Sequence, residues 1–246
     1  MIPYLFIGVG VLSLILFLIK RDKYSSVLAI ILKTITSICF VIVGVSSLYT
    51  IDGNSLTTNL FIILGLVFGL IGDIVLDFKI YFRGLGREFD SNMLTYFGMI
   101  SFGFGHILYI CGSFIEVMDL WVYLLISLGI GAILIVLIIL LSTKVMKMNY
   151  GIFLVPSLLY GFLLASFVSF SIFRMVYYPN AKSILLMIGS VFFIISDLVL
   201  SMTYFSKEED YKKDGILNPE SRFMISINHI TYYIAQFLIA ICILFI

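Results

Sequence analysis

The stretch LGLVFGLIGDIVL at residues 64–76 contains a single charged residue, Asp73, inside a run that is otherwise apolar enough to cross a membrane. A second stretch, IGSVFFIISDLVL at residues 188–200, repeats the pattern with Asp197 at the matching position. A carboxylate at that depth in a bilayer costs at least ~2.5 kcal/mol, so such residues are rarely accidental. The two stretches therefore predict a membrane protein with a pair of functional carboxylates.

The similarity of these stretches indicates an internal duplication. The two aspartates lie 124 positions apart, and the only two histidines of the chain, His106 in GHILY and His229 in NHITY, lie 123 positions apart. We predict two halves, about residues 1–116 and 117–246, that each contribute one aspartate and one histidine to a common interior.

The composition defines the fold class. The chain is 62% hydrophobic and 12% charged, with a mean hydropathy of +1.18, whereas soluble domains carry roughly 25% charged residues. Runs of about 20 apolar residues predict transmembrane helices. Eight such runs lie near residues 3–20, 26–49, 57–78, 93–115, 120–142, 150–173, 182–204 and 222–245. We therefore expect an all-α polytopic membrane protein, with one integral membrane domain over residues 1–246 built from two parallel four-helix repeats.

The basic residues predict the topology. They follow every second span and almost all fall on one side of the membrane, with only Arg174 and Lys182 on the other. The basic loops carry Lys20, Arg21, Lys23, Lys79, Arg83, Arg87, Lys144, Lys147, Lys207, Lys212, Lys213 and Arg222. By the positive-inside rule these loops face the cytoplasm and both termini lie outside it. Since each half has four spans, the halves share one orientation and an axis along the membrane normal. The residue usage suggests a bacterial cytoplasmic membrane.

Several polar residues fall inside the spans. Counting 1.5 Å per residue from the basic ends puts Lys33, Asp73, Asp197 and His229 within ~12 Å of that face and His106 at ~20 Å. Because lipid disfavours each of these groups, we expect them to turn inward and form a polar cavity. The inward set also includes Tyr109, Asn228, Tyr232, Tyr233 and Gln236.

Some of these residues have a simpler alternative. Lys33 could extend its side chain to the interface, and Asp77, one turn after Asp73, could be solvated. Glu116, in the loop on the side of the termini, is expected to be solvated as well. A buried histidine is often structural, although matched repeat positions favour a functional role for His106 and His229.

Other chemistry finds little support. Two aspartates and two histidines could hold zinc, but no His-x-x-His spacing accompanies them, so we expect neither a metal nor a cofactor. The net charge of +1 gives no indication of a nucleic-acid partner, and the sequence carries no signal for the oligomeric state.

The motifs together resemble the YhhN family of membrane proteins, whose animal members include lysoplasmalogenases. The resemblance covers most of the chain. It rests on Lys33, GDIVL at 72–76, YFGMISFGFGHILYI at 96–110, Pro156, Tyr160, SDLVL at 196–200 and YYIAQFLI at 232–239. Thr34 departs from the family pattern, in which a proline usually follows the lysine.

The resemblance implies an enzyme that hydrolyses the vinyl ether bond of a lysophospholipid, releasing a fatty aldehyde and a glycerophospho head group. The predicted catalytic residues are Asp73, Asp197, His106 and His229. The predicted substrate-binding residues are Lys33, Tyr109, Tyr160, Asn228, Tyr233 and Gln236. Two carboxylates in a low-dielectric site can divide into an acid and an ionised partner, as in glycoside hydrolysis, but the sequence leaves open which aspartate is the acid. The alternative function is a proton-coupled transporter of small molecules or lipids, since parallel repeats with intramembrane carboxylates also occur there.

Overall fold

A computed structural model describes residues 1–21, 25–48 and 56–245, and every regular element in this part of the chain is a helix. Eight α-helices are long and apolar enough to cross a membrane, which confirms the predicted all-α polytopic fold. They are α1 (Ile2–Lys20), α2 (Val27–Ser47), α3 (Leu56–Gly84), α4 (Glu88–Ile115), α5 (Trp121–Lys144), α6 (Leu154–Tyr177), α7 (Ala181–Phe205) and α8 (Arg222–Ile241). Short 3₁₀ turns are η3 (Met118–Leu120), η4 (Gly151–Phe153), η5 (Asp210–Lys212) and η6 (Cys242–Leu244).

Side-chain caps define where three of the helices begin. Ser26, Asn180 and Ser221 precede α2, α7 and α8, and each side-chain oxygen accepts a hydrogen bond from the backbone N–H three residues later. These bonds are 2.8–3.2 Å long and satisfy a donor that the helix cannot pair internally. The caps therefore stabilise the helix starts next to the polar segments between spans.

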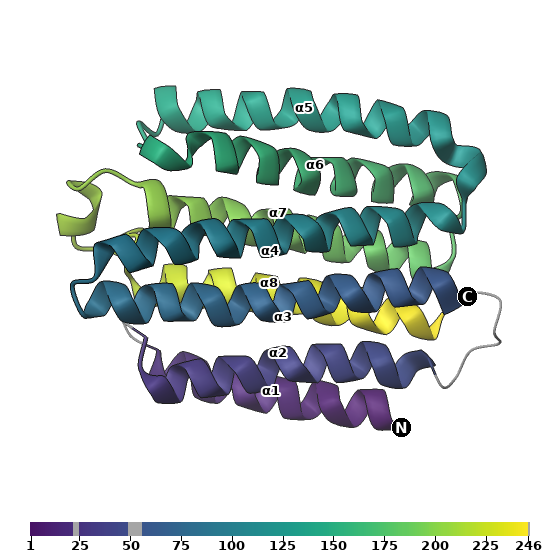
Figure 1. Ribbon diagram of the computed structural model, residues 1–246, viewed down its shortest axis with the longest axis horizontal. Helices are drawn as coiled ribbons and strands as arrows, with labels where there is room; N and C mark the ends of the chain where they lie inside the picture. Colours follow the sequence, from purple (N-terminus) through teal and green to yellow (C-terminus); the bar gives the residue numbers. More distant parts are fainter. Residues whose placement is uncertain (22–24, 49–55, 246) are drawn as a thin grey trace.

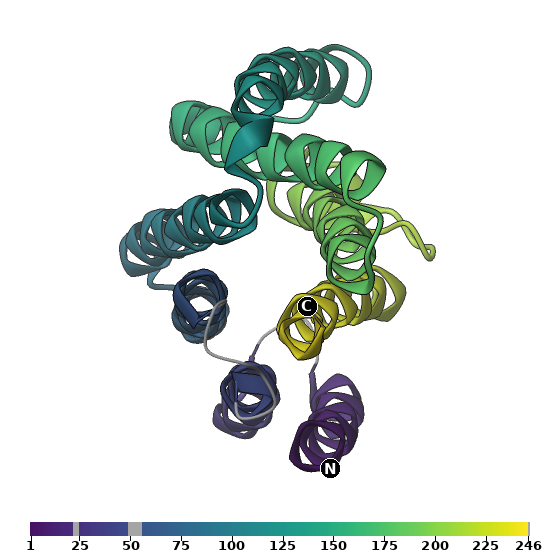
Figure 2. The same cartoon turned by 90° about the vertical axis from the view of Figure 1, so that its right-hand side faces the viewer.

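The helices form a ring, and α1 and α5 lie outside it (Figure 2). The ring runs α2, α3, α4, α6, α7, α8 and back to α2, while α1 packs against α2 and α5 against α6. Matching helices of the two predicted halves, α1–α4 and α5–α8, have matching neighbours. Within each half, α3 packs on α4 as α7 packs on α8; between the halves, α4 packs on α6 as α8 packs on α2. This recurrence is what the duplication predicts, and the superposition of the two halves stays a prediction.

Matched glycines allow the closest helix pairs to approach. A Cβ atom on Gly65 of α3 would lie 2.4 Å from the ring of Tyr109 and 3.1 Å from the carbonyl oxygen of Gly105, both on α4. In the second half, a Cβ atom on Gly189 of α7 would lie 3.2 Å from the carbonyl oxygen of Ala235 on α8. Small residues are favoured where helices in a membrane pack backbone to backbone.

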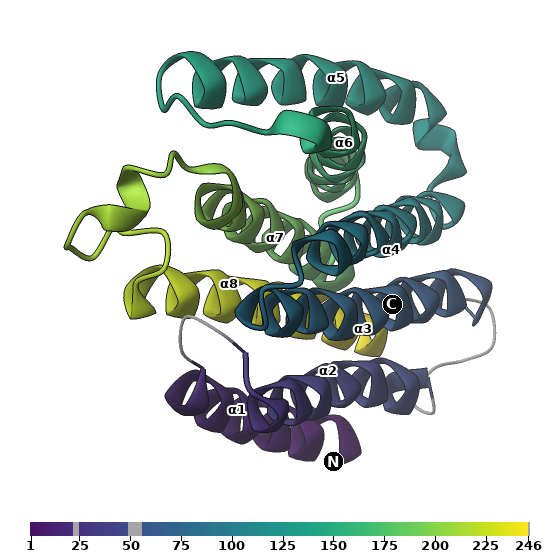
Figure 3. The ribbon, with the colours of Figure 1, turned by 60° about the vertical axis from the view of Figure 1, so that its left-hand side comes forward.

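The two ends of the bundle differ in charge. Both termini lie at one end, which we call the termini end (Figure 1). We call the opposite end the basic end; it comprises residues 20–21, 84–88, 144–150 and 206–221, and Figure 3 shows the last of these connections extending beyond α7 and α8. Most of the basic residues used to predict the topology lie here, and Lys23 lies outside the described residues.

Candidate active site

A cavity of about 180 Å³ lies inside the ring and reaches the basic end. One water molecule needs only ~10–15 Å³ on this measure, so the space can hold part of an organic molecule. Residues of every helix from α2 to α8 line it, so the cavity also extends to α5 outside the ring, and both Asp73 and Asp197 lie on its wall. The structure thus brings together the two aspartates that the sequence pattern singled out.

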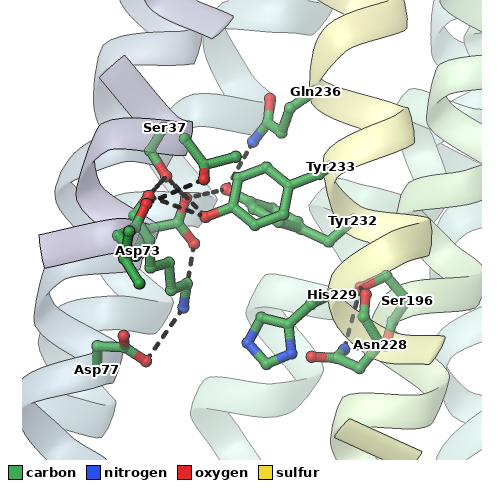
Figure 4. Close-up of polar contacts among 12 residues, drawn as sticks. Ser37, Asp73, Asp77, Ser196, Asn228, His229, Tyr232, Tyr233 and Gln236 are labelled. Carbon is green, nitrogen blue, oxygen red and sulfur yellow. Dashed lines mark hydrogen bonds and ion pairs between the residues drawn. The ribbon is translucent and has the colours of Figure 1, made fainter. Parts of the chain in front are cut away.

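Asp73 is buried and receives its hydrogen bonds from the protein (Figure 4). Its Oδ2 atom accepts bonds from the Ser37 hydroxyl at 2.7 Å and from the Tyr232 hydroxyl at 2.8 Å. Its Oδ1 atom lies 3.5 Å from the ammonium nitrogen of Lys33. Two hydroxyl donors and one cation stabilise the ionised form of this carboxylate.

Lys33 turns into the protein and lies between two carboxylates. Its Nζ atom is 3.5 Å from Asp77 Oδ1 as well as from Asp73 Oδ1, and the side chain is 7% exposed. The alternative in which Lys33 extends to the interface is therefore wrong. So is the interpretation of Asp77 as solvated, because Asp77 is 2% exposed. Lys33 attracts both carboxylates of α3 since they lie on one helix face, one turn apart.

A chain of hydrogen bonds extends from Asp73 into the core, away from the cavity. The Tyr109 hydroxyl donates to Gln236 Oε1 at 2.8 Å, and Gln236 Nε2 donates to the Tyr232 hydroxyl at 2.9 Å, which in turn donates to Asp73. Tyr233 joins the same network through a 2.9 Å hydrogen bond with Ser37. Tyr109, Tyr233 and Gln236 were predicted to bind substrate, but none of them lies among the residues that line the cavity.

Asp197 has fewer partners. The hydroxyl of Tyr160 on α6 donates to its Oδ2 atom, and within the described residues no hydrogen bond reaches Oδ1. Behind Tyr160, the Nε2 atom of His106 lies 3.3 Å from the tyrosine hydroxyl. Because Tyr160 uses its proton to reach Asp197, it accepts the Nε2–H proton of His106. His106 is fully buried, with its ring centroid 4.7 Å from that of Phe193, and it contacts Asp197 only through Tyr160.

His229 and Asn228 occupy the α8 side of the cavity (Figure 4). His229 Nδ1 lies 2.7 Å from the backbone oxygen of Ile225, and a carbonyl only accepts, so Nδ1 carries a proton. In the neutral ring, Nε2 is then an acceptor. Asn228 instead joins helices: its Nδ2 atom donates to the backbone oxygen of Ser196 at 2.8 Å, which places α8 against α7 next to Asp197.

Two further residues of this site were not assigned a role from sequence. Ser37 lies one turn after Lys33 on α2, and that spacing is the signal that could have placed both on the same inward face. Asp77 likewise lies one turn after Asp73 on α3, so the same spacing could have placed it on the inward face. Among the described residues, no group of three or more His, Cys, Asp or Glu side chains is arranged to hold a metal ion.

The termini end contains a separate buried ionic cluster. Arg174 and Lys182, both 1% exposed, bind the carboxylate of Glu116, whose side chain is 21% exposed. Lys182 Nζ also donates to Asn59 Oδ1 at 2.9 Å, and Arg174 Nε to Ser183 Oγ at 3.1 Å. Glu116 is exposed, as the sequence predicted, but its carboxylate also binds two buried cations that the sequence did not predict as its partners.

The fold and the site define a polytopic membrane protein with a carboxylate-lined cavity that reaches one face of its helical ring. The chain belongs to the YhhN family, whose model matches residues 28–243. No curated protein and no solved structure matches the chain.

Proposed function

We propose that this protein is a membrane hydrolase that cleaves the vinyl ether bond of lysoplasmalogen-like lysophospholipids. The observation that carries the proposal is the pair of carboxylates, Asp73 and Asp197, on the wall of one cavity with unequal hydrogen bonding. The family membership supports it, and so does a cavity that adjoins both polar residues and a membrane-embedded apolar wall.

The unequal hydrogen bonding supports a division of the two roles. Asp73, with two hydroxyl donors and the Lys33 ammonium, serves as the ionised carboxylate. Asp197 accepts one hydrogen bond on Oδ2 and none from the described residues on Oδ1. It serves as the acid, with its proton on Oδ1. Two carboxylates in such different environments can divide the acid and base functions between them.

The reaction then proceeds without a cofactor. Asp197 transfers its proton to the β-carbon of the vinyl ether, and the electron pair of the double bond forms the new C–H bond. The carbon next to the ether oxygen becomes an oxocarbenium ion, which the negative charge of Asp73 stabilises. Water adds to that carbon and gives a hemiacetal, losing one proton. The hemiacetal collapses to a fatty aldehyde and a glycerol hydroxyl as its own hydroxyl proton passes to the departing glycerol oxygen, and the proton lost by water restores Asp197 to its protonated form.

His229 is the proposed base for the water. Its neutral ring offers Nε2 as an acceptor on the cavity side, because Nδ1 donates to Ile225. His106 and Tyr160 act as positioning residues for Asp197, and Tyr109, Tyr233 and Gln236 as positioning residues for Asp73. This assignment differs from the sequence prediction, which gave His106 a catalytic role and assigned Tyr109, Tyr160, Tyr233 and Gln236 to substrate binding.

The lining of the cavity suggests how a single-chain lipid would lie. Toward α5 the wall is apolar, where Ile135, Ile138 and Ile139 of α5 and Leu164 of α6 line the cavity. At the basic end the lining includes the charged residues Arg21, Arg83 and Glu220. We propose that the alkenyl chain occupies the α5 side and the phosphate head lies toward the basic end, as amphiphilic pockets generally arrange their ligands.

The orientation in the membrane belongs to the same proposal. The concentration of Lys and Arg at the basic end supports a cytoplasmic location for that end and a non-cytoplasmic location for both termini. The substrate would then enter from the inner leaflet of a bacterial cytoplasmic membrane.

Aldehyde release tests the proposal. The purified protein in detergent is given a lysoplasmalogen, and fatty aldehyde is trapped as an oxime and quantified, with the Asp197→Asn protein as the control preparation. We expect catalytic turnover by the wild type and loss of it in the variant. Equal aldehyde from both preparations would point to a contaminant or to spontaneous hydrolysis and would overturn the assignment.

A further inference from the structure

Asp77 has an incomplete set of hydrogen bonds for a buried carboxylate. Its Oδ1 atom lies 3.5 Å from Lys33 Nζ, while its Oδ2 atom is buried and has no hydrogen-bond partner in the part of the chain that the structure describes. A buried acceptor without a donor is costly, and most of all when the acceptor is charged. The fold therefore carries an acceptor that nothing in the described part of the protein satisfies.

The contrast with Asp73 makes this feature informative. Both carboxylates lie on α3, both are 2% exposed, and both pair with the same lysine. The described residues supply Asp73 with hydroxyl donors from Ser37 and Tyr232 but supply none to Asp77 Oδ2. Since Asp77 is also part of the cavity wall, the missing donor is one that a molecule in the cavity can bring.

The position of Asp77 indicates which donor this is. Asp73 Oδ1 and Asp77 Oδ1 each lie 3.5 Å from one nitrogen atom, so these two oxygen atoms are no further apart than twice that distance. In a lysophospholipid, the free hydroxyl on the middle glycerol carbon is separated from the reacting vinyl carbon by only a few bonds. The amine of the head group lies much further along the molecule. A second ammonium at this carboxylate would also lie close to the Lys33 ammonium and be repelled by it.

We propose that Asp77 accepts a hydrogen bond from the free glycerol hydroxyl of the substrate and thereby selects single-chain over two-chain ether lipids. The inference rests on the proposed function, which it deepens. A two-chain lipid carries an ester where the hydroxyl would be, so it offers no donor to Oδ2 and leaves the carboxylate unsatisfied. Sites built to bind a substrate hydroxyl discriminate strongly against analogues that lack it.

The test compares two synthetic substrates in the same protein preparation. Both carry the same alkenyl chain and phosphoethanolamine head; one has the free hydroxyl and the other has hydrogen in its place. We expect the wild type to prefer the hydroxyl substrate in kcat/KM by about 10–100-fold, the range for hydrogen bonds to charged groups. In Asp77→Asn the preference should fall below about 10-fold, as for a neutral acceptor. Asp90→Asn, a change at an exposed carboxylate of α4, should keep the wild-type ratio.

The ratio of two substrates does not depend on the fraction of folded protein, so partial misfolding of a variant leaves the test valid. A wild type that shows no preference, or an Asp77→Asn protein with an unchanged preference, would overturn the inference. The ratio of kcat/KM between phosphoethanolamine and phosphocholine substrates is measured as well. If Asp77→Asn changed that ratio but left the hydroxyl preference unchanged, Asp77 would bind the head group and the inference would be overturned.

Binding measurements separate this inference from the proposed function. The dissociation constants of saturated, non-cleavable lysophosphatidylethanolamine and of its deoxy analogue are measured in detergent for the wild type and for Asp77→Asn. If no lipid yields aldehyde but the hydroxyl preference in binding depends on Asp77, the hydrolase proposal fails and the recognition holds. If aldehyde is released but the hydroxyl preference does not depend on Asp77, the hydrolase proposal holds and the recognition fails.

Discussion

The basic end and the termini end of the bundle both contain buried charges, but they use them differently. At the termini end, one carboxylate is shared by two buried cations, and Asn59 and Ser183 take up remaining donors. Toward the basic end, Asp73, Asp77, Asp197 and Lys33 line a cavity, and one oxygen atom each of Asp77 and Asp197 has no protein donor within the described residues. Buried charge alone therefore does not identify a site; incomplete pairing beside a cavity does.

The largest expected effect is at the cavity carboxylates. Asp197→Asn and Asp73→Asn should each lower the rate of aldehyde release by at least ~10²–10⁴-fold, because a positioned acid or base contributes about that much. The matched control is Asp119→Asn, at an exposed carboxylate of the termini end. Turnover close to wild type in either cavity variant would remove the dicarboxylate mechanism.

The next effect concerns stability and belongs to the termini end. Glu116→Gln leaves Arg174 and Lys182 buried without their carboxylate, and breaking a buried pair in this way costs about 3 kcal/mol or more. We expect a lower thermal unfolding temperature in detergent but an unchanged turnover number per folded molecule. An activity loss larger than the loss of folded protein would mean that the two ends are coupled.

A smaller effect is expected behind Asp197. Tyr160→Phe removes the hydrogen bond to its Oδ2 atom, which strengthens as Asp197 loses its proton and becomes charged, so we expect about a 10–100-fold lower rate. His106→Gln should lose less, since His106 contacts Tyr160 rather than Asp197. Tyr211→Phe, a loop tyrosine that donates to a backbone oxygen, is the control. A greater loss in His106→Gln than in Tyr160→Phe would favour a histidine-centred site instead.

The smallest expected effect is an absence of labelling. Ile62 of α3 and Leu186 of α7 are fully buried on the termini side of the two aspartates. Cysteines placed there, in a background without Cys39, Cys111 and Cys242, should resist water-soluble thiol reagents with or without lipid. A cysteine at Leu217, an exposed loop residue at the basic end, is the positive control. Labelling at Ile62 or Leu186 that depends on lipid would indicate alternating access and support the transporter.

The sequence was sufficient to predict the features that follow from the cost of placing polar groups in lipid. Long apolar runs predict the eight helices, and a lone aspartate within such a run predicts a side chain that turns away from lipid. What it could not supply was the partner of each charge. The cations that pair with Asp77 and Glu116, Lys33 and Arg174, come from other helices, and these contacts depend on how those helices pack.

The same limit applies to the roles inside the site. Tyr109 and Gln236 are polar residues on inward helix faces. A residue with this pattern can either line a cavity or belong to a buried hydrogen-bond network. Only the assembled ring shows that Tyr109 of α4 and Gln236 of α8 hydrogen-bond to each other across its interior, behind Asp73. Likewise, the two aspartates lie at matching positions of two similar sequence stretches, and their different donors become visible only when α2 and α6 are in place.

Hydrolysis in heavy water tests the central claim most directly, because the proton that Asp197 transfers becomes a C–H bond in the product. The wild-type protein is allowed to convert a lysoplasmalogen in D₂O, and the aldehyde is trapped at once and analysed by mass spectrometry. We expect a single deuterium on the carbon next to the aldehyde group, no deuterium in recovered substrate, and no product from Asp197→Asn. Aldehyde that carries no deuterium, or the same labelled product from Asp197→Asn, would contradict proton transfer from this carboxylate.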